Sequence, residues 1–176
     1  NEGEWVWANG IGGSDTEYGG AVDATISGAY VTGSFSSLNS SFGFDSKGDE
    51  VYSTSTSGIE HAFVAKYYSS GNVAWLEVPE TTSAWAEAIG IHVNYDYENP
   101  EIYVTGYYTG SIDFSNLNGP GNETVLQAVD STDVYTYKII ENQWKDIRNL
   151  EWVLGIHGQG SEYSTDIAIN TNEDVF

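Results

Sequence analysis

The chain has 176 residues, a length that suits one ordinary domain, and it carries 26 acidic against 5 basic side chains for a net charge of −21. A surface this negative repels phosphate backbones and anionic lipid headgroups, which argues against nucleic acids and membrane surfaces as partners. The chain contains no cysteine, which excludes a disulfide scaffold and thiolate chemistry but not secretion. No apolar run approaches the ~20 residues that span a bilayer, so we expect no membrane insertion.

The composition favours an all-β protein. Aromatic residues make up 14% of the chain, and their large flat side chains pack well on the pleated surface of a sheet. Short apolar runs are bounded by Gly, Asn, Asp or Ser, which is typical of strands joined by turns. No long stretch keeps the 3.6-residue period of a helix.

The expected strands form a repeating series. In chain order they lie at 4–8, 21–23, 30–33, 62–67, 73–78, 88–91, 103–106, 134–139, 150–154, 167–169 and 175–176. The run Tyr-Val-Thr-Gly at 30–33 returns at 103–106, and Lys66 in its strand is matched by Lys138. A fixed period of this size indicates that each repeat is one supersecondary unit that stacks on its neighbours.

The repeats divide the chain into four parts. We expect 1–20 to hold the last strand of a preceding unit and a turn, 21–78 to be one four-stranded unit, 79–154 to be a second unit with long inserts, and 155–176 to begin a further one. The fold class we predict is all-β, with antiparallel four-stranded units in tandem.

The order of motifs resembles the seven-bladed β-propeller type repeat of prokaryotic secreted and cell-surface proteins. The matching residues lie at 21–35 and 62–75 and, more loosely, at 88–107 and 134–152. The resemblance implies propeller blades and an extracellular or cell-surface location, and it carries no catalytic residues. The chain departs from the family in its longer repeats and in the degenerate run at 135–139.

Two full units are too few to close a propeller, which has typically 4–8 blades. The expected units at both ends therefore present unpaired edges, and exposed edges recruit other strands. Three arrangements would satisfy them: an excerpt of a longer array, a ring closed by symmetry, or copies joined head to tail in a filament. The partners we expect are copies of the chain or neighbouring propeller repeats, with glycans as a further class.

The connection between the second and third strand is long in both units. It runs over about 34–60 and 107–133, and each copy contains an Asn-x-Ser/Thr triplet, at Asn39 and Asn122. Loops in the same slot emerge on one side of an array, so glycans on both would coat one face. The Ser/Thr run at 53–57 is a candidate for O-linked sugar, and bare polar loops are the alternative.

The sequence shows no catalytic or cofactor constellation. The three histidines, His61, His92 and His157, do not stand at a metal-ligand spacing from one another, and the chain has no cysteine, so we expect no metal site on them. No Gly-rich run leads into a helix and no nucleophile elbow is present. Weak calcium candidates are three acidic loop clusters, which lack a full calcium-loop spacing: Asp45, Asp49 and Glu50; Asp96 and Glu98; Asp130 and Asp133.

Three functions remain open. The first is a non-enzymatic extracellular β-propeller repeat protein, serving as a structural or adhesive cell-surface element or as a subunit of an extracellular fibre. The second is a lectin-like or calcium-dependent carbohydrate-binding propeller, with sugars stacked on Trp85, Tyr107, Tyr108 and Trp144. The third is a glycan-active enzyme with paired carboxylates, for which no particular pair stands out.

Overall fold

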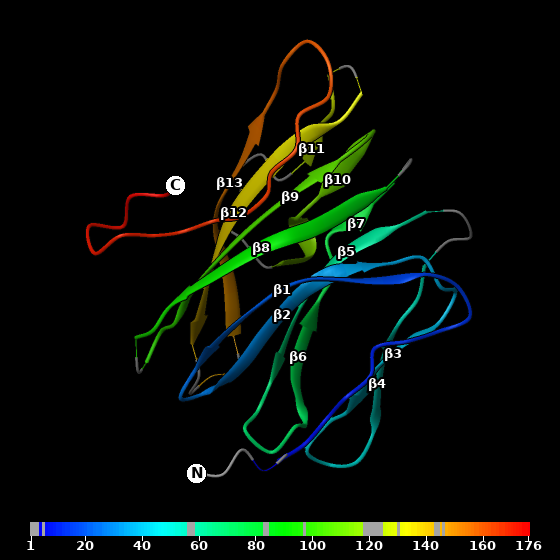
Figure 1. The fold of residues 1–176 in the computed structure, drawn as a ribbon, viewed down its shortest axis with the longest axis vertical. Coiled ribbons are helices and arrows are strands. Elements are labelled where there is room, and N and C mark those ends of the chain that lie inside the picture. Colours follow the sequence, from blue (N-terminus) through cyan, green and yellow to red (C-terminus); the bar gives the residue numbers. More distant parts are fainter. Residues whose placement is uncertain are drawn as a thin grey trace.

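The computed structural model describes residues 4, 6–55, 59–82, 85–96, 98–117, 125–129, 131–142, 145 and 147–176. Its strands form four antiparallel sheets, two of which have four strands (Figure 1). Within the described ranges the helical residues amount to a single 3-10 turn, η1 (Ser115–Leu117). The prediction of an all-β chain is thus confirmed. In the same ranges, no helix has the length and apolar character needed to traverse a bilayer.

The two four-stranded sheets have the same topology. The first has the order β1 (Glu17–Thr25), β2 (Gly28–Phe35), β5 (His61–Tyr67) and β6 (Val73–Glu77). The second has the order β8 (Ala86–Asn94), β9 (Glu101–Tyr108), β12 (Asp133–Asn142) and β13 (Ile147–Ile156). Each of the eight strands expected between residues 21 and 154 overlaps one of these, and the observed strands extend as far as four residues beyond the expected ends.

The long inserts carry strands of their own. The hairpin β3 (Ser40–Phe44) with β4 (Glu50–Ser53) follows β2, while β10 (Ser111–Asp113) pairs with β7 (Glu80–Thr81) and β11 (Val125–Gln127). Each insert covers the same face of its own sheet. Phe42 packs edge-on against Phe63 at 5.0 Å, and Phe114 packs edge-on against Tyr135 at 5.5 Å, at the corresponding place.

The two large sheets pack face to face. Strand β8 lies against β1, β2 and β5 of the first sheet (Figure 1). Because side chains alternate along a strand, one face of the first sheet and the facing side of the second share a single apolar core, which includes Val64, Val104 and Tyr137. The opposite face of the first sheet has a separate core under the β3–β4 hairpin and the N-terminal segment.

The glycine of the Tyr-Val-Thr-Gly motif has a steric role in both sheets. A Cβ on Gly33 would lie 2.0 Å from the backbone oxygen of Tyr18, and one on Gly106 would lie 2.0 Å from that of Glu87. Both carbonyls belong to a neighbouring strand with a β-bulge close by, in β1 and in β8. Only a residue without a side chain fits there.

The chain ends differ from the expectation that they are strands. Residues 4 and 6–8 have no strand assignment, because no described segment lies beside them as a hydrogen-bonded partner; instead Trp7 stacks on Tyr67 at 6.0 Å. At the other end, 167–176 forms a narrow turn with one isolated bridge, between Ile169 and Val175, and no full strand. The expected division of the chain into four parts remains a prediction.

Candidate functional site

Three large side chains stand in one row across the first sheet. Tyr30 on β2 is directly opposite Lys66 on β5, and Lys66 is directly opposite Trp75 on β6. Opposed residues in neighbouring strands point to the same face of a sheet. The row therefore faces the second sheet, where the Lys66 ammonium lies 5.1 Å from the centre of the Tyr30 ring.

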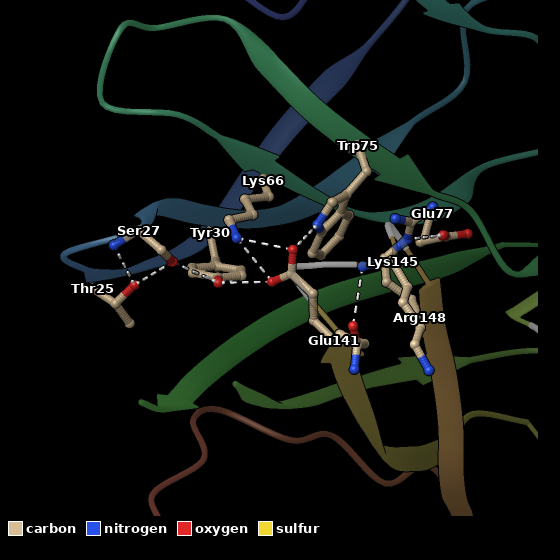
Figure 2. A network of polar contacts seen from close by, with 10 residues as sticks. Thr25, Ser27, Tyr30, Lys66, Trp75, Glu77, Glu141, Lys145 and Arg148 are labelled. Carbon is tan, nitrogen blue, oxygen red and sulfur yellow. Dashed lines mark hydrogen bonds and ion pairs between the residues drawn. The ribbon is translucent and has the colours of Figure 1, made fainter. Parts of the chain in front are cut away.

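Glu141, near the end of β12 in the second sheet, is the acidic partner of this row (Figure 2). Both of its carboxylate oxygens lie 2.9 Å from Lys66 Nζ. Trp75 Nε1–H donates to Oε1 and the Tyr30 hydroxyl donates to Oε2, each at 3.0 Å. The side chains of Lys66 and Glu141 are 2% and 7% exposed, so the ion pair is almost fully withdrawn from water.

The cluster extends along both flanks. The Tyr30 hydroxyl also bonds to Ser27 at 3.2 Å, and Ser27 bonds to Thr25 at 2.8 Å. Burial, and secondarily the carboxylate of Glu141, raises the pKa of the Tyr30 phenol well above its usual range. On the other flank, Arg148 pairs with Glu77 at 2.5 Å and lies 5.3 Å from the centre of the Trp75 ring.

This arrangement is suited to holding two sheets together. The carboxylate of Glu141 accepts bonds from three side chains, all of which belong to the opposite sheet. A buried ion pair is tolerated when further hydrogen bonds satisfy the groups around it, as they do here. On the flank of the cluster, Glu77 lines a pocket of about 530 Å³.

The second sheet carries the same row one unit further on. Tyr103, Lys138 and Trp152 are opposed across β9, β12 and β13, with the Lys138 ammonium 5.2 Å from the centre of the Tyr103 ring. Here the nearest carboxylate belongs to the same sheet: Glu101 Oε1 lies 2.5 Å from Lys138 Nζ and accepts from Tyr103 through Oε2. Burial is the largest influence and lowers the pKa of the Lys138 ammonium, but the hydrogen bonds and charges of Glu101 and Tyr103 together outweigh burial, so the net shift is upward.

The carboxyl groups of Glu60 and Glu87 lie near enough to each other for the charge of one to affect the other. Burial raises the pKa of the Glu60 carboxyl, the hydrogen bond from Ser34 lowers it less, and the nearby charge of Glu87 raises it further. Glu87 accepts a hydrogen bond from the Tyr107 hydroxyl at 2.7 Å. The cavity that Glu87 lines has a volume of about 130 Å³, well under the ~300–1,000 Å³ of small-molecule sites.

A histidine–carboxylate pair was not foreseen from the sequence. Asp133, the fully buried first residue of β12, accepts hydrogen bonds at 2.8 Å from His157 Nδ1 and from the Val129 backbone. Burial raises the pKa of the Asp133 carboxyl, but the His157 bond and its companions outweigh burial, so the net shift is downward. The two residues are 24 positions apart, and no local motif joins them.

The predicted calcium candidates are engaged in turns or pairs. Asp45 Oδ1 accepts from the backbone of Lys47 and Asp49, and Asp96 Oδ1 accepts from that of Glu98. Asp133 bonds to His157, and Asp130 lies outside the described residues. Within the part of the chain that the structure describes, no three acidic or histidine side chains gather as a metal site would require.

The predicted sugar-stacking residues are not a single platform. The prediction that Tyr108 stacks on a sugar is wrong, because its side chain is fully buried against Tyr135 in the core. Trp85 and Tyr107 contact each other edge-to-face at 5.3 Å, and Trp144 lies outside the described residues. Of the two predicted glycosylation sites, Asn39 is exposed immediately before β3, while Asn122 and residues 56–58 of the Ser/Thr insert also lie outside the described ranges.

A pocket with an unpaired histidine lies beside the first sheet. His61 is buried, and neither of its ring nitrogens has a hydrogen-bond partner among the described residues. Burial lowers the pKa of its imidazole, which is therefore neutral at pH 7. His61 lines a pocket of about 530 Å³ together with Tyr52, Glu80 and Asn116.

Comparisons of the chain with models of protein families, with curated protein sequences and with solved structures find no match.

Proposed function

We propose that this chain is a non-enzymatic extracellular repeat protein of the β-propeller type, in which four-stranded sheets stack face to face, and that it acts as a structural or adhesive cell-surface element. The observation that carries the proposal is the Lys66–Glu141 pair. It joins one unit to the next through two opposite charges that are almost fully withdrawn from water. A fibre subunit is one form of this role, because a repeated face-to-face contact extends in one direction.

The charge and the inserts support a location outside the cell. A net charge of −21 keeps separate molecules apart at low ionic strength and is screened as salt increases. The inserts are rich in Ser, Thr and Asn, and Asn39 is exposed at the start of one of them. Such a surface is compatible with a glycan coat around an array.

Electron microscopy and sedimentation of the purified protein at low and high ionic strength test the proposal. We expect ordered filaments or stacks that grow as salt screens the repulsion. A protein that stays monomeric under all conditions, or that hydrolyses glycans, would overturn the structural role. Mass spectrometry of native material would show whether Asn39 carries a glycan, as a surface location predicts.

A carbohydrate-binding role is the second candidate, and the His61 pocket favours it. The exposed Tyr52 ring offers a stacking face on the pocket wall, and Glu80 and Asn116 supply polar groups to the same wall. A glycan screen tests this role. Binding that is lost in Tyr52→Ala but kept in Tyr18→Ala, another exposed tyrosine, would support it, and absence of binding would reject it.

A further inference from the structure

The outer face of the second sheet repeats the face that the first sheet uses for stacking. Tyr103, Lys138 and Trp152 occupy the same register as the row on the first sheet, but point away from the core between the sheets. We propose that this outer face, with residues 161–176 lying on it, is the docking surface for a further four-stranded sheet of the same repeat. The inference rests on the proposed function and deepens it by naming the surface and its occupant.

The C-terminal segment contacts the second sheet as β8 contacts the first. Glu60 and Trp85 form an isolated parallel bridge, with the Ala86 N–H bonded to the Glu60 carbonyl at 3.0 Å. Thr132 and Ser161 form the corresponding bridge, with the Glu162 N–H bonded to the Thr132 carbonyl at 2.8 Å. The segment thus stands where the first strand of a next unit would stand (Figure 1).

A glycine near the bulge of each first strand lies close to the backbone of the following segment. A Cβ on Gly20 of β1 would lie 2.1 Å from the Ala88 carbonyl oxygen in β8. A Cβ on Gly90 of β8 would lie 3.0 Å from Asp166 Cα in the C-terminal segment. Close approach of a first strand to the segment that follows its sheet therefore occurs at both steps, which continues the established interface by one unit.

The two faces differ in how completely the side chains beyond the first strand are covered. On the first sheet, Thr32, Ala62 and Val64 are fully buried beneath the second sheet. Their counterparts Thr105 and Val134 are also buried, but together with the half-buried Thr136 they line a cleft of about 440 Å³ between the second sheet and the C-terminal segment. Five large apolar side chains are exposed around it: Leu154, Ile156, Tyr163, Val175 and Phe176. Such a concentration marks an interaction surface.

The charge at this face fits the same occupant. Lys66 is neutralised by Glu141 of the next sheet, whereas Lys138 has Glu101 of its own sheet and the exposed Glu173 at 3.9 Å. A docked sheet of this repeat would bring a carboxylate to the place that Glu173 occupies. The partner we infer is therefore an antiparallel sheet with an apolar face and an acidic residue near the end of its third strand.

An extended chain tests the surface directly. Phe176 exchanges backbone hydrogen bonds with Ala168, in the way that Tyr30 is paired with Asp23. A copy of residues 104–156 is therefore appended after Phe176. Because the natural chain has no cysteine, Ile156→Cys in the original unit gives a unique thiol at the cleft. Val22→Cys, exposed on β1, is the matched control.

We expect Ile156→Cys to react with a thiol reagent at least about tenfold more slowly in the extended chain than in the 176-residue chain, because the appended sheet covers it. Val22→Cys should react equally in both. Equal rates for Ile156→Cys, or an appended unit that stays unfolded by circular dichroism, would overturn the proposal. Protection without any assembly of the natural chain would leave the docking surface standing and reject the structural role.

Discussion

Lys66 Nζ lies 2.9 Å from both carboxylate oxygens of Glu141, a residue 75 positions away and in the other large sheet. The pair is the centre of the contact between two units of the same topology (Figure 2). Its energetic role follows from burial: removing one charge leaves the other without compensation in a medium that solvates it poorly.

Glu141→Gln should therefore lower the free energy of unfolding by about 3–5 kcal/mol. The single amide oxygen of glutamine can still accept from Trp75, and its amide N–H can donate to the Tyr30 hydroxyl, so the loss reports mainly the uncompensated ammonium of Lys66. Urea unfolding at pH 7 measures it. Glu151→Gln, exposed on β13, serves as control and should change stability by less than ~0.5 kcal/mol. A cost below ~1 kcal/mol for Glu141→Gln would show that the pair is not withdrawn from water as described.

The motif glycines should resist substitution. Gly33→Ala and Gly106→Ala each place a methyl group about 2.0 Å from a backbone oxygen, so we expect a loss of about 1–3 kcal/mol or a failure to fold. Gly19→Ala meets nothing within 4 Å and should be nearly neutral. Thermal unfolding measures the melting temperatures of the three variants. Equal melting temperatures for all three would contradict the packing described for the bulged strands.

The Glu60 carboxyl should destabilise the fold as pH rises. Its pKa in the folded chain is above the ordinary value of 4.5, so the neutral form is favoured in the fold. Stability from this group is complete below pH ~4.5 and is lost as pH rises through the raised pKa. Glu60→Gln should then stabilise the chain at pH 7 more than at pH 4. Glu151→Gln reports the general benefit of removing one negative charge, and an equal gain from both variants would refute the assignment.

Asp133 should stabilise the fold more as pH rises, whereas Glu60 should stabilise it less. Its folded pKa is below the ordinary value of 3.8, so its stabilisation is present above that value and is lost as pH falls through the lowered one. We expect Asp133→Asn to cost about 1–3 kcal/mol at pH 7 and little at pH 2. Chemical denaturation at both pH values measures this. A loss of equal size at both would indicate a packing defect rather than the pairing with His157.

Much of the local structure was available from the sequence. The apolar runs at 30–33 and 103–106 repeat with their neighbours at one spacing, and every strand expected between 21 and 154 is present. The expected strand at 4–8 was wrong, since apolar residues form a strand only beside a hydrogen-bonded partner. Tyr108 was misplaced because an aromatic residue at a strand end looks the same whether it faces solvent or core.

The sequence by itself determined the strand class, the repeat and the inserts, because turn residues and alternation act over a few positions. The tertiary structure decided which face of each sheet meets the next. That choice brought Glu141 to Lys66 across 75 residues, whereas the antiparallel pairing of β12 with β13 within one sheet brought His157 to Asp133 across 24 residues. Pairing of buried charges depends on how two sheets are laid together in space, and no local pattern along the chain encodes that geometry.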